Sequence, residues 1–439
     1  MLDIKTIREN PDGFKEAAKN KNIKLDVDRL LVLDDERKEN QEIIDDLRAK
    51  RNEHAKNTKN GKPTEEQIEE GKKIKEQIAK AEEKLNAILP EYMELMVKVP
   101  NIPAPDVPVG KDESGNVEIE RFGNPRKFDF EPKDHITLGK ELDIIDFERG
   151  VKVSGYRGYY MKNEGASLQM ALMMYALEKL IQKGFTPVIP PTLVREFVLF
   201  GSGYFAGKTF NEGVDEIYKI ENNKEIESDG QVNKDYKFLI GTAEPSLLAY
   251  YANEVLDKKQ LPIKFCGFSP CYRSEIGSYG KDTKGLYRVH EFMKVEQVCL
   301  VGADVEESDK LHQEMLNISK EMHKEIGLPY RVLRICTGDM SAGKYKMFDM
   351  EAWIPSRGGY GETGSASNFL DWQARRLNVR YKEENGEKKF VYMLNNTAIP
   401  SPRFIISILE NFQNEDGTVT IPEVLRKYMP GNTDVIKKK

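Results

Sequence analysis

The sequence predicts an α+β fold in which a helical coiled-coil arm precedes a domain of mixed helices and strands. Residues 28–98 are highly charged and repeat apolar positions at heptad spacing, a pattern typical of long paired helices. Prolines at positions 100, 103, 105 and 108 then predict a stiff, extended stretch, after which aromatic, glycine and β-branched residues become more frequent. We therefore expect an arm at residues 1–99, a proline-rich linker at 100–116 and a second domain at 117–439.

Composition and charge limit the classes of function. The 439-residue chain is long enough for two or three domains. Its net charge of −6 does not attract nucleic acid to the molecule as a whole. A local basic patch can still bind phosphate. The charged first residues and the lack of an apolar run near ~18 residues predict a cytoplasmic protein without a secretory signal or membrane span. No zinc site is expected, and buried free thiols are expected at Cys266, Cys271, Cys299 and Cys336, which lack CxxC spacing.

Residues 28–98 predict two long helices joined by a bend at Gly61 and Pro63. Because the bend is short, the two helices must run antiparallel. The expected apolar seam comprises Leu30, Leu33, Ile44 and Leu47 on the first helix and Ile74, Ile78, Ala81, Leu85, Ile88, Tyr92 and Leu95 on the second. Toward the bend the seam becomes polar at Arg51 and His54, so the apolar core is expected to fade there.

The stretch RAKRNEHAKNTKNGK around this bend contains six basic residues and one acidic residue. Such local positive charge suits contact with a nucleic-acid backbone. The alternative from this region alone is a solvated coiled-coil hairpin that meets only protein partners. The candidate RNA-contacting residues are Arg48, Lys50, Arg51, Lys56, Lys59 and Lys62.

Three segments of the second domain carry local structural signals. Residues 167–184 predict a helix that is buried on most sides. The segment FTPVIPPTLV contains three prolines, which favours an edge strand or an interface over a central strand. The segment KFLIGTAEPSLLAYYANEVL predicts a strand, a turn and a helix, so that Thr242 and Glu244 lie at the helix start, where capping is their ordinary role.

The stretch CYRSEIGSYGKDTKGLYRVHEFMKVEQ predicts two strands joined by a glycine-rich loop. Along the strand expected from Leu286 to Val301, alternate positions separate a mostly apolar set from a charged set. The charged set, which includes one aromatic residue, is Arg288, His290, Phe292, Lys294 and Glu296. If the strands pair, Arg273 and Glu275 share one concave surface with Phe292 and Glu296. The alternative is an exposed sheet face laced with ion pairs.

Two further segments predict binding of a metal and of an anion. Glu362 and Ser365 follow the strand KMFDMEAWIP in a glycine-rich bend and supply hard oxygen ligands, which magnesium prefers. Arg403 lies at the start of the helix FIISILENF, where a cation opposes the helix dipole at a cost of roughly a few tenths of a kcal/mol. An arginine that is present in spite of this cost is typical of a site that binds an anion.

Taken together, these motifs resemble those of the class II aminoacyl-tRNA synthetases, and most closely the seryl-tRNA synthetase family, over nearly the full chain. GFTPVIPPTLV, with Pro191, resembles motif 1, and CYRSEIGSYGKDTKGLYRVHEF resembles motif 2. PRFIISILENF resembles motif 3, and GTAEP resembles the serine-site triplet, which outweighs the capping role of Thr242 and Glu244. The resemblance implies an antiparallel-sheet catalytic domain and a homodimer formed through motif 1.

The implied activity is that of a serine–tRNA ligase, which uses ATP and Mg²⁺ to make seryl-adenylate from L-serine. The seryl group would pass to tRNA(Ser) and, by extension, to tRNA(Sec), with no membrane involved. Arg273 and Arg403 would be catalytic, and Glu362 with Ser365 would hold the metal. The implied ATP-binding residues are Arg273, Ser274, Glu275, Val289, Phe292, Glu362, Thr363, Gly364, Ser365 and Arg403. The implied serine-binding residues are Thr242, Ala243, Glu244, Arg273, Glu296 and Thr397. The implied tRNA-binding residues are Lys281 and Lys284 together with the basic residues of the arm.

One departure and three competing functions accompany this resemblance. The stretch NNTAIPSPR is less glycine-rich than motif 3 usually is, which bears on the serine pocket around Thr397 and on the rejection of threonine. A ligase for another small amino acid, such as a threonyl or prolyl enzyme, would carry an anticodon-binding domain after the motif 3 helix, where only a short stretch follows. A catalytically altered, RNA-binding paralogue is the second competing function, and a carrier-protein ligase is the third. The sequence leaves the role of His290 open: it belongs to the charged set, and the alternative is a hydrogen-bonded structural residue.

Overall fold

The computed structural model describes residues 1–57, 64–205, 207–220, 225–226, 232–233, 236–276 and 284–438. These residues divide into two compact units, Met1–Ile102 and Pro103–Lys439. Within the described ranges, no helix combines the length and the apolar character needed to cross a membrane.

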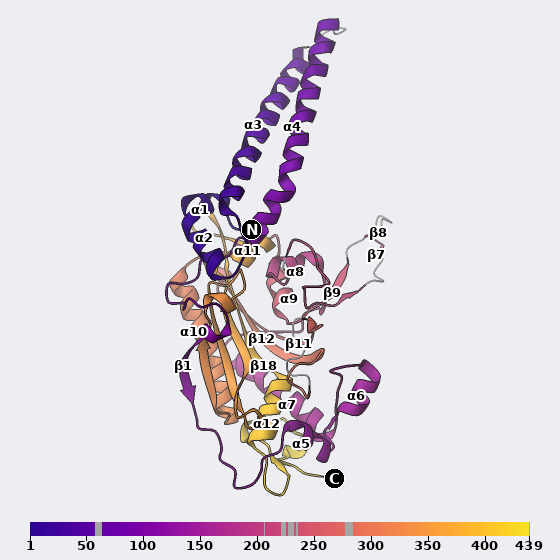
Figure 1. Cartoon of the computed structure of the whole chain (residues 1–439), viewed down its shortest axis with the longest axis vertical. Helices are drawn as coiled ribbons and strands as arrows, with labels where there is room; N and C mark the ends of the chain where they lie inside the picture. Colours follow the sequence, from indigo (N-terminus) through magenta and orange to yellow (C-terminus); the bar gives the residue numbers. More distant parts are fainter. Residues whose placement is uncertain are drawn as a thin grey trace. The chain divides into compact units, whose positions relative to one another are not determined.

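The helices described in the first unit are α1 (Ile4–Glu9), α2 (Pro11–Asn20), α3 (Val27–Asn57) and α4 (Glu65–Lys98). The two long helices, α3 and α4, lie side by side (Figure 1). Side-chain contacts join them in opposite order along the chain, in the pairs Arg29–Glu91, Arg48–Glu82 and His54–Glu70. The helices are therefore antiparallel, and the predicted helical arm is confirmed.

Seven of the eleven predicted seam residues are buried, namely Leu30, Leu33, Ile44, Ile74, Ile78, Ala81 and Tyr92, whereas Leu47, Leu85, Ile88 and Leu95 are half-buried. The heptad pattern did not predict the buried acid Asp34. Its carboxylate pairs with Arg8, Arg37 and Lys38 at 2.9, 2.8 and 2.6 Å. Burial alone would raise the pKa of Asp34, but the hydrogen bonds from these three cations outweigh it and lower the pKa to about 2. A charged cluster therefore reinforces this part of the helix pair.

The second unit is built on a sheet that has eight strands in the described part of the chain (Figure 1). The pairings are antiparallel, except that the last strand runs parallel to its neighbour. The strands in spatial order are β1 (Val117–Phe122), β13 (Tyr330–Arg334), β14 (Lys346–Ile354), β15 (Gly359–Asn368), β18 (Tyr392–Pro400), β12 (Glu291–Val301), β11 (Ile263–Tyr272) and β4 (Thr186–Val188). The predicted α+β class with an antiparallel catalytic sheet is thus confirmed, and β4, from FTPVIPPTLV, lies at the sheet edge as expected.

The helices α7 (Asn163–Gln182), α10 (Val305–Ile326) and α12 (Ser401–Asn411) pack against this sheet (Figure 1). Their apolar side chains form one core with alternate residues of β12, which include Val295 and Cys299. Because successive side chains of a strand point to opposite faces, the residues between them point away from this core. The predicted charged face is confirmed for Lys294 and Glu296. Val298 and Leu300 on the same face belong instead to a second apolar cluster, and Phe292 packs against the first core.

Smaller elements complete the second unit. The remaining helices are α5 (His135–Glu141), α6 (Phe147–Ser154), α8 (Glu196–Ser202), α9 (Glu244–Leu248), α11 (Trp372–Leu377) and α13 (Glu423–Arg426), with short 3₁₀ turns η1 (Glu113–Gly115), η2 (Ala249–Tyr251), η3 (Lys258–Gln260), η5 (Thr337–Asp339), η6 (Pro355–Arg357) and η7 (Pro430–Asn432). The remaining strands are β2 (Ile145–Asp146), β3 (Tyr160–Met161), β5 (Leu193–Arg195), β6 (Lys219–Ile220), β7 (Glu225–Ile226), β8 (Val232–Asn233), β9 (Lys237–Leu239), β10 (Val255–Asp257), β16 (Arg380–Lys382), β17 (Lys388–Phe390), β19 (Val419–Thr420) and β20 (Val435–Ile436).

Two expectations about strand ends were wrong. The hairpin strands stop at Tyr272 and resume at Glu291, so Arg273, Glu275 and residues 286–290 lie outside them. Glu275 adopts a φ of 55°, in the left-handed region, which a regular strand does not contain.

The glycine-rich bend expected at Glu362 and Ser365 is instead part of strand β15. Its glycines serve close packing and not a turn, since a Cβ added at Gly364 would lie 3.1 Å from the Thr397 carbonyl oxygen. Small residues here let β15 and β18 approach each other closely.

Candidate active site

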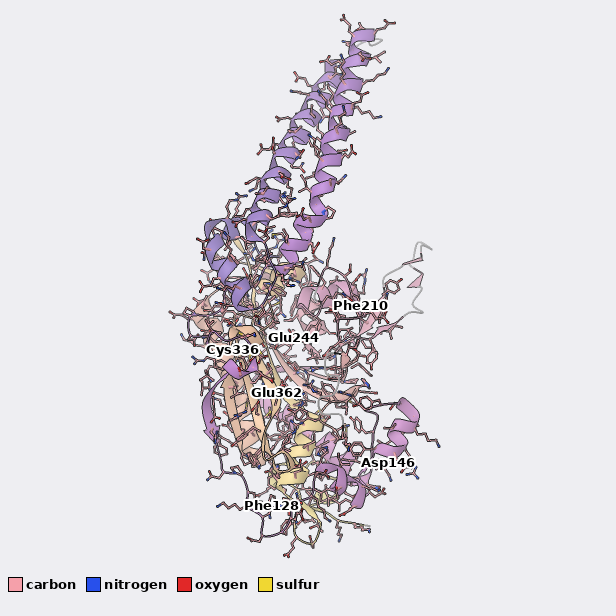
Figure 2. The ribbon with its side chains drawn as sticks, in the orientation of Figure 1. Phe128, Asp146, Phe210, Glu244, Cys336 and Glu362 are labelled. Carbon is pink, nitrogen blue, oxygen red and sulfur yellow. The ribbon has the colours of Figure 1, made fainter. Side chains whose placement is uncertain are left out.

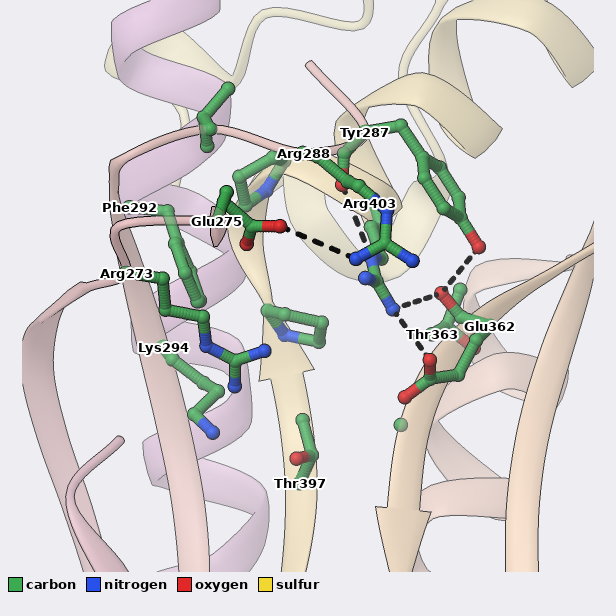
Figure 3. A pocket seen from close by; sticks show the side chains of 14 residues that line it. Arg273, Glu275, Tyr287, Arg288, Phe292, Lys294, Glu362, Thr363, Thr397 and Arg403 are labelled. Atoms are coloured by element: carbon green, nitrogen blue, oxygen red, sulfur yellow. Dashed lines mark hydrogen bonds and ion pairs between the residues drawn. The ribbon is translucent and has the colours of Figure 1, made fainter. Parts of the chain in front are cut away.

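A pocket opens where β12, β15 and β18 meet the start of α12 (Figure 3). Its lining comprises Arg273, Glu275, Tyr287, Arg288, Val289, Phe292, Lys294, Glu362, Thr363, Gly364, Thr397, Pro400, Pro402 and Arg403. Eight of the ten predicted ATP-binding residues are in this lining, and Ser274 and Ser365 are not. Of the predicted serine-binding residues, Arg273 and Thr397 line the pocket, whereas Thr242, Ala243, Glu244 and Glu296 lie buried outside the lining. Figure 2 labels Glu244 and Glu362 within the second unit.

Arg403 is held at one wall of the pocket by strand β15 and by Tyr287 (Figure 3). Its Nη1 lies 3.1 Å from the Glu362 carboxylate and donates to the Glu362 carbonyl oxygen at 2.9 Å. Its guanidinium also lies 4.5 Å from the centre of the Tyr287 ring. Burial disfavours the charge on Arg403, but the neighbouring Glu362 carboxylate outweighs this effect and raises the pKa of the guanidinium. The wall therefore presents a fixed, permanently charged cation.

The opposite wall combines an aromatic ring with a second guanidinium. Arg273 lies 5.5 Å from the centre of the Phe292 ring, and its Nε donates to the Gly241 carbonyl oxygen at 3.3 Å. Beside it, the carboxylate of Glu275 lies 3.3 Å from Arg288 Nη1. This arrangement offers a flat apolar face, an acceptor and cations within one cavity.

Two buried carboxylates lie next to this pocket. Glu244 accepts hydrogen bonds from Tyr204 at 3.0 Å and from Gln373 at 2.8 Å, so its side chain does not cap helix α9. Glu296 pairs with Lys294 at 2.7 Å and accepts from the Thr397 hydroxyl at 3.2 Å. Lys294 and Thr397 both line the pocket, which links Glu296 to it directly. Glu244 is linked through its electrostatic interactions with Glu296 and Lys294.

The two carboxylates influence each other electrostatically. Burial, together with the negative charge of Glu296, raises the pKa of Glu244 to about 7. The hydrogen bonds from Gln373 and Tyr204 act in the opposite direction but do not offset the burial. Glu244 is therefore a carboxylate whose charge depends on pH near neutrality, in a place where a ligand cation would stabilise it.

One of the two predicted magnesium ligands, Ser365, lies opposite an acidic residue, Asp349. Ser365 pairs in register with Asp349 across β14 and β15. Within the described residues, the buried Ser365 Oγ and Asp349 Oδ1 make no hydrogen bond of regular geometry, although Ser365 lies close enough to Asp349 to favour its ionised form. Burial and repulsion from Glu362 raise the pKa of Asp349 well above its usual value. Unpartnered hard oxygens and crowded acidic groups are what a small divalent cation would satisfy, so these residues fit Mg²⁺.

The predicted tRNA-binding residues lie in both units. Arg48, Lys50, Arg51 and Lys56 are exposed on α3, and Arg48 also pairs with Glu82 at 2.8 Å. Lys284 is exposed just before the pocket segment 287–289. Lys59, Lys62 and Lys281 lie outside the described residues.

Sequence reasoning left several residues of the site without a role. Arg288 and Lys294 were placed on the charged face by the period of two, which was the available signal. Tyr204 and Gln373 come from distant elements, and no local pattern pointed to them. For His290, whose role the sequence left open, the structure shows two hydrogen bonds to Arg273. Its Nδ1 donates to the Arg273 carbonyl oxygen, and the Arg273 amide donates to the His290 carbonyl oxygen, both at 2.9 Å.

Comparison with known proteins first defines a class of enzyme. A family model described as the tRNA synthetase class II core domain (G, H, P, S and T) matches residues 218–412, which contain the pocket. A model described as the seryl-tRNA synthetase N-terminal domain matches residues 1–103. The sheet and its pocket are accordingly those of a class II aminoacyl-tRNA synthetase.

Relatives that match this chain over nearly its whole length indicate which class II synthetase family it belongs to. A serine–tRNA ligase from Borrelia garinii subsp. bavariensis is 45% identical over 98% of both chains. A crystal structure of seryl-tRNA synthetase from Pyrococcus horikoshii, complexed with ATP, is 40% identical over 100% of both chains, with a TM-score of 0.88. The cytoplasmic serine–tRNA ligase of Naegleria fowleri, in complex with AMP, is 30% identical with a TM-score of 0.84 and covers 100% of this chain and 99% of that chain. The chain belongs to the seryl-tRNA synthetase family, which confirms the resemblance of its motifs.

Proposed function

We propose that this serine–tRNA ligase activates serine with ATP in the pocket described above and transfers the seryl group to tRNA(Ser). The observation that carries the proposal is that a pocket lined by cations lies close to two buried carboxylates. Arginine side chains, among them Arg273 and Arg403, line the pocket, and the carboxylates of Glu244 and Glu296 lie next to it. Guanidinium groups suit phosphates and a carboxylate, whereas paired carboxylates suit an ammonium and a hydroxyl. ATP and serine together carry all of these groups.

Serine is oriented in this proposal by the different partners of the two carboxylates. The hydrogen bonds to Glu244 come from the neutral groups of Tyr204 and Gln373, so an incoming ammonium would supply its compensating charge. Glu296 is already paired with Lys294, so it would accept a hydrogen bond from the serine hydroxyl. A pocket that satisfies the hydroxyl in this way would reject alanine, because the polar groups of the pocket would stay unpaired.

ATP would occupy the main cavity with its base on Phe292 and its phosphates between Arg273 and Arg403. The carboxylate of Glu275 would accept from the amino group of adenine. The serine carboxylate is ionised near neutral pH, so its attack on the α-phosphate needs no general base. Catalysis would then come from the positioning of the two substrates and from stabilisation of negative charge by Arg273 and Arg403.

Glu362 and Ser365 would hold Mg²⁺, with Asp349 beside them. The metal would supply neutralisation of the phosphate oxygens when pyrophosphate leaves. The side chain of Glu362 is 43% exposed and faces Arg403, so one carboxylate would hold both the metal and the arginine that contacts the phosphates.

The second step requires tRNA and, in this proposal, the arm. We assign the arm to residues 1–99, the linker to 100–116 and the catalytic domain to 117–439. The basic residues Arg48, Lys50, Arg51 and Lys56 would contact the tRNA backbone, together with Lys59 and Lys62. Lys281 and Lys284 would guide the acceptor end toward the adenylate. The same reaction would attach serine to tRNA(Sec) where that tRNA is present. The reaction would take place in the cytoplasm, where ATP, serine and tRNA are all present.

The motif 1 region supports a homodimer. Met170, Met174 and Ile181 on helix α7 are 45%, 50% and 48% exposed, and Ile189, just after β4, is 81% exposed. Apolar side chains gathered on neighbouring elements in this way are typical of a surface covered by a partner. We propose that a second copy of the chain covers them.

A substitution at Glu296 tests the serine site. Glu296→Gln should raise the KM for serine in ATP–pyrophosphate exchange by about 10-fold to 100-fold, because hydrogen bonds to charged groups contribute about 1.5–3 kcal/mol. The KM for ATP should change little. Glu291→Gln, which alters an exposed carboxylate on the same strand, is the matched control. A normal KM for serine in Glu296→Gln would contradict the assignment.

A further inference from the structure

Polar side chains next in sequence to the proposed serine-site residues are turned toward helix α10. Successive side chains of a strand point to opposite faces, so Gln297 and Asn396 point away from Glu296 and Thr397. Both amides donate to the Met315 carbonyl oxygen of α10, at 3.4 and 2.8 Å. Gln297 is 0% exposed and Asn396 is 1% exposed, so these contacts lie wholly within the core.

The hydroxyl of Ser319, one turn further along α10, joins both strands. It accepts from Asn396 Nδ2 at 2.8 Å and from Gln297 Nε2 at 3.3 Å, and it donates to the Thr397 carbonyl oxygen at 3.3 Å. A hydroxyl has one proton and two lone pairs, so all of its hydrogen-bonding capacity is used. One side chain of α10 thus fixes the strand of Glu296 relative to the strand of Thr397.

His323, four residues after Ser319, extends this network to the third strand. Its Nδ1 lies 2.8 Å from the Ser319 carbonyl oxygen, which can only accept, so Nδ1 carries the proton. Burial lowers the pKa of His323 to about 4, so the ring is neutral and Nε2 is an acceptor. The Thr363 hydroxyl, 2.8 Å away, donates to it, although the Met350 carbonyl oxygen is also within 3.2 Å. Thr363 follows Glu362 directly on β15.

The contact with Ser319 coincides with an irregularity of the sheet. The pairing of β12 with β18 shifts register between Val295 and Glu296. At such a bulge the ladder is interrupted, and backbone hydrogen bonds fix the strands less strictly. Thr397, the partner of Glu296 in that register, is the residue whose carbonyl oxygen Ser319 binds.

We propose that Ser319 and His323 are positioning residues that hold Glu296, Thr397 and Glu362 at the separation needed for serine activation. This inference rests on the proposed serine site and deepens it. The hydrogen bonds of Ser319 and His323 connect three strands to one helix, and a buried polar network of this kind specifies one arrangement of the strands. The network contacts the strands and not the substrate, so its loss should be felt first as weaker and less selective binding of serine.

Ser319→Ala tests this role, and Ser308→Ala is the matched control. Ser308 is also on α10 and buried, and its hydroxyl accepts from Asn368 at 2.8 Å, but Asn368 does not line the pocket. In ATP–pyrophosphate exchange, Ser319→Ala should raise the KM for serine by about 10-fold, the factor for one buried hydrogen bond, with little change in the KM for ATP. The preference for serine over threonine should fall. Ser308→Ala should lower the melting temperature similarly and leave both KM values unchanged.

The outcomes separate this inference from the serine site itself. A raised KM for serine in Ser319→Ala but not in Ser308→Ala supports the positioning role. Equal behaviour of the two variants would overturn it, and if Glu296→Gln still raises the KM for serine, the serine site stands. A normal KM for serine in Glu296→Gln would overturn both. If Ser319→Ala does not fold, Ser319→Cys, which fills the site but forms only weak hydrogen bonds, should show the same selective rise, and its absence would count against the role.

Discussion

Serine binding should release a proton from Glu244 near neutral pH. The pKa of this buried carboxyl is raised from 4.5 to about 7 by burial and by the negative charge of Glu296. The groups that face it are Tyr204 and Gln373, which donate to it, and Lys294, whose charge acts in the opposite sense to that of Glu296. An ammonium placed against Glu244 would favour its ionised form and lower its pKa again. Near pH 7, where about half of the carboxyls are protonated, binding should release about half a proton per site.

The raised pKa also has a consequence for stability. A shift of about 2.5 pKa units corresponds to roughly 3 kcal/mol of disfavoured ionisation. Because the folded-state pKa lies above the unfolded value, the contribution of Glu244 to stability is fully present below about pH 4.5 and is lost as the pH rises through about 7. A fixed concentration of serine should therefore raise the melting temperature more at pH 8 than at pH 6.

Isothermal titration calorimetry measures this proton directly. Serine is titrated into the protein at pH 7 in buffers that differ in ionisation enthalpy, and the slope of binding enthalpy against that quantity gives the protons released. Glu244→Gln should reduce the slope to near zero. Tyr204→Phe, which removes a donor that favours the ionised form, should shift the release to higher pH. No dependence on buffer in the unsubstituted protein, or an unchanged slope in Glu244→Gln, would refute the assignment of the ammonium to Glu244.

Two further substitutions test the remaining parts of the site. Arg403→Ala should reduce serine-dependent ATP–pyrophosphate exchange by about 100-fold to 1,000-fold, the usual effect of removing one charge-stabilising donor, whereas Arg375→Ala, outside the pocket, should not. Near-normal exchange in Arg403→Ala would argue against its contact with phosphate. Replacing residues 37–82 with a short linker should leave exchange intact and abolish tRNA charging, because the basic end of the arm is removed. Parallel loss of both activities in a folded protein would contradict the role of the arm.

Periodic patterns predicted much of this architecture. The heptad spacing of residues 28–98 indicated the paired helices, because an apolar seam must be buried along its whole length. The period of two placed Phe292, Lys294 and Glu296 on one face of a strand, because side chains alternate between the two faces of a sheet. Arg403 stood out because a cation at a helix start opposes the helix dipole, which favours an arginine that binds an anion. In the structure the Glu362 carboxylate, 3.1 Å away, is one such anion.

Other features depend on contacts between distant segments and leave no local pattern. Glu275 leaves the strand through a positive φ, which a run of alternating residues does not reveal. Tyr204, just after helix α8, and Gln373, on helix α11, reach Glu244 from separate segments, so their role appears only in three dimensions. Asp34 occupies a heptad position next to the apolar seam, and its burial requires three cations that come from two different helices.

The central claim is that this pocket activates serine and excludes its neighbours in size and polarity. ATP–pyrophosphate exchange with the purified full chain, measured separately with serine, threonine, alanine and proline, tests it most directly. Serine should support exchange, and alanine should be at least about 100-fold poorer in kcat/KM, because a pocket built for a hydroxyl leaves its polar groups unpaired without one. Exchange that is equal for alanine and serine, or that requires threonine or proline instead, would contradict the account.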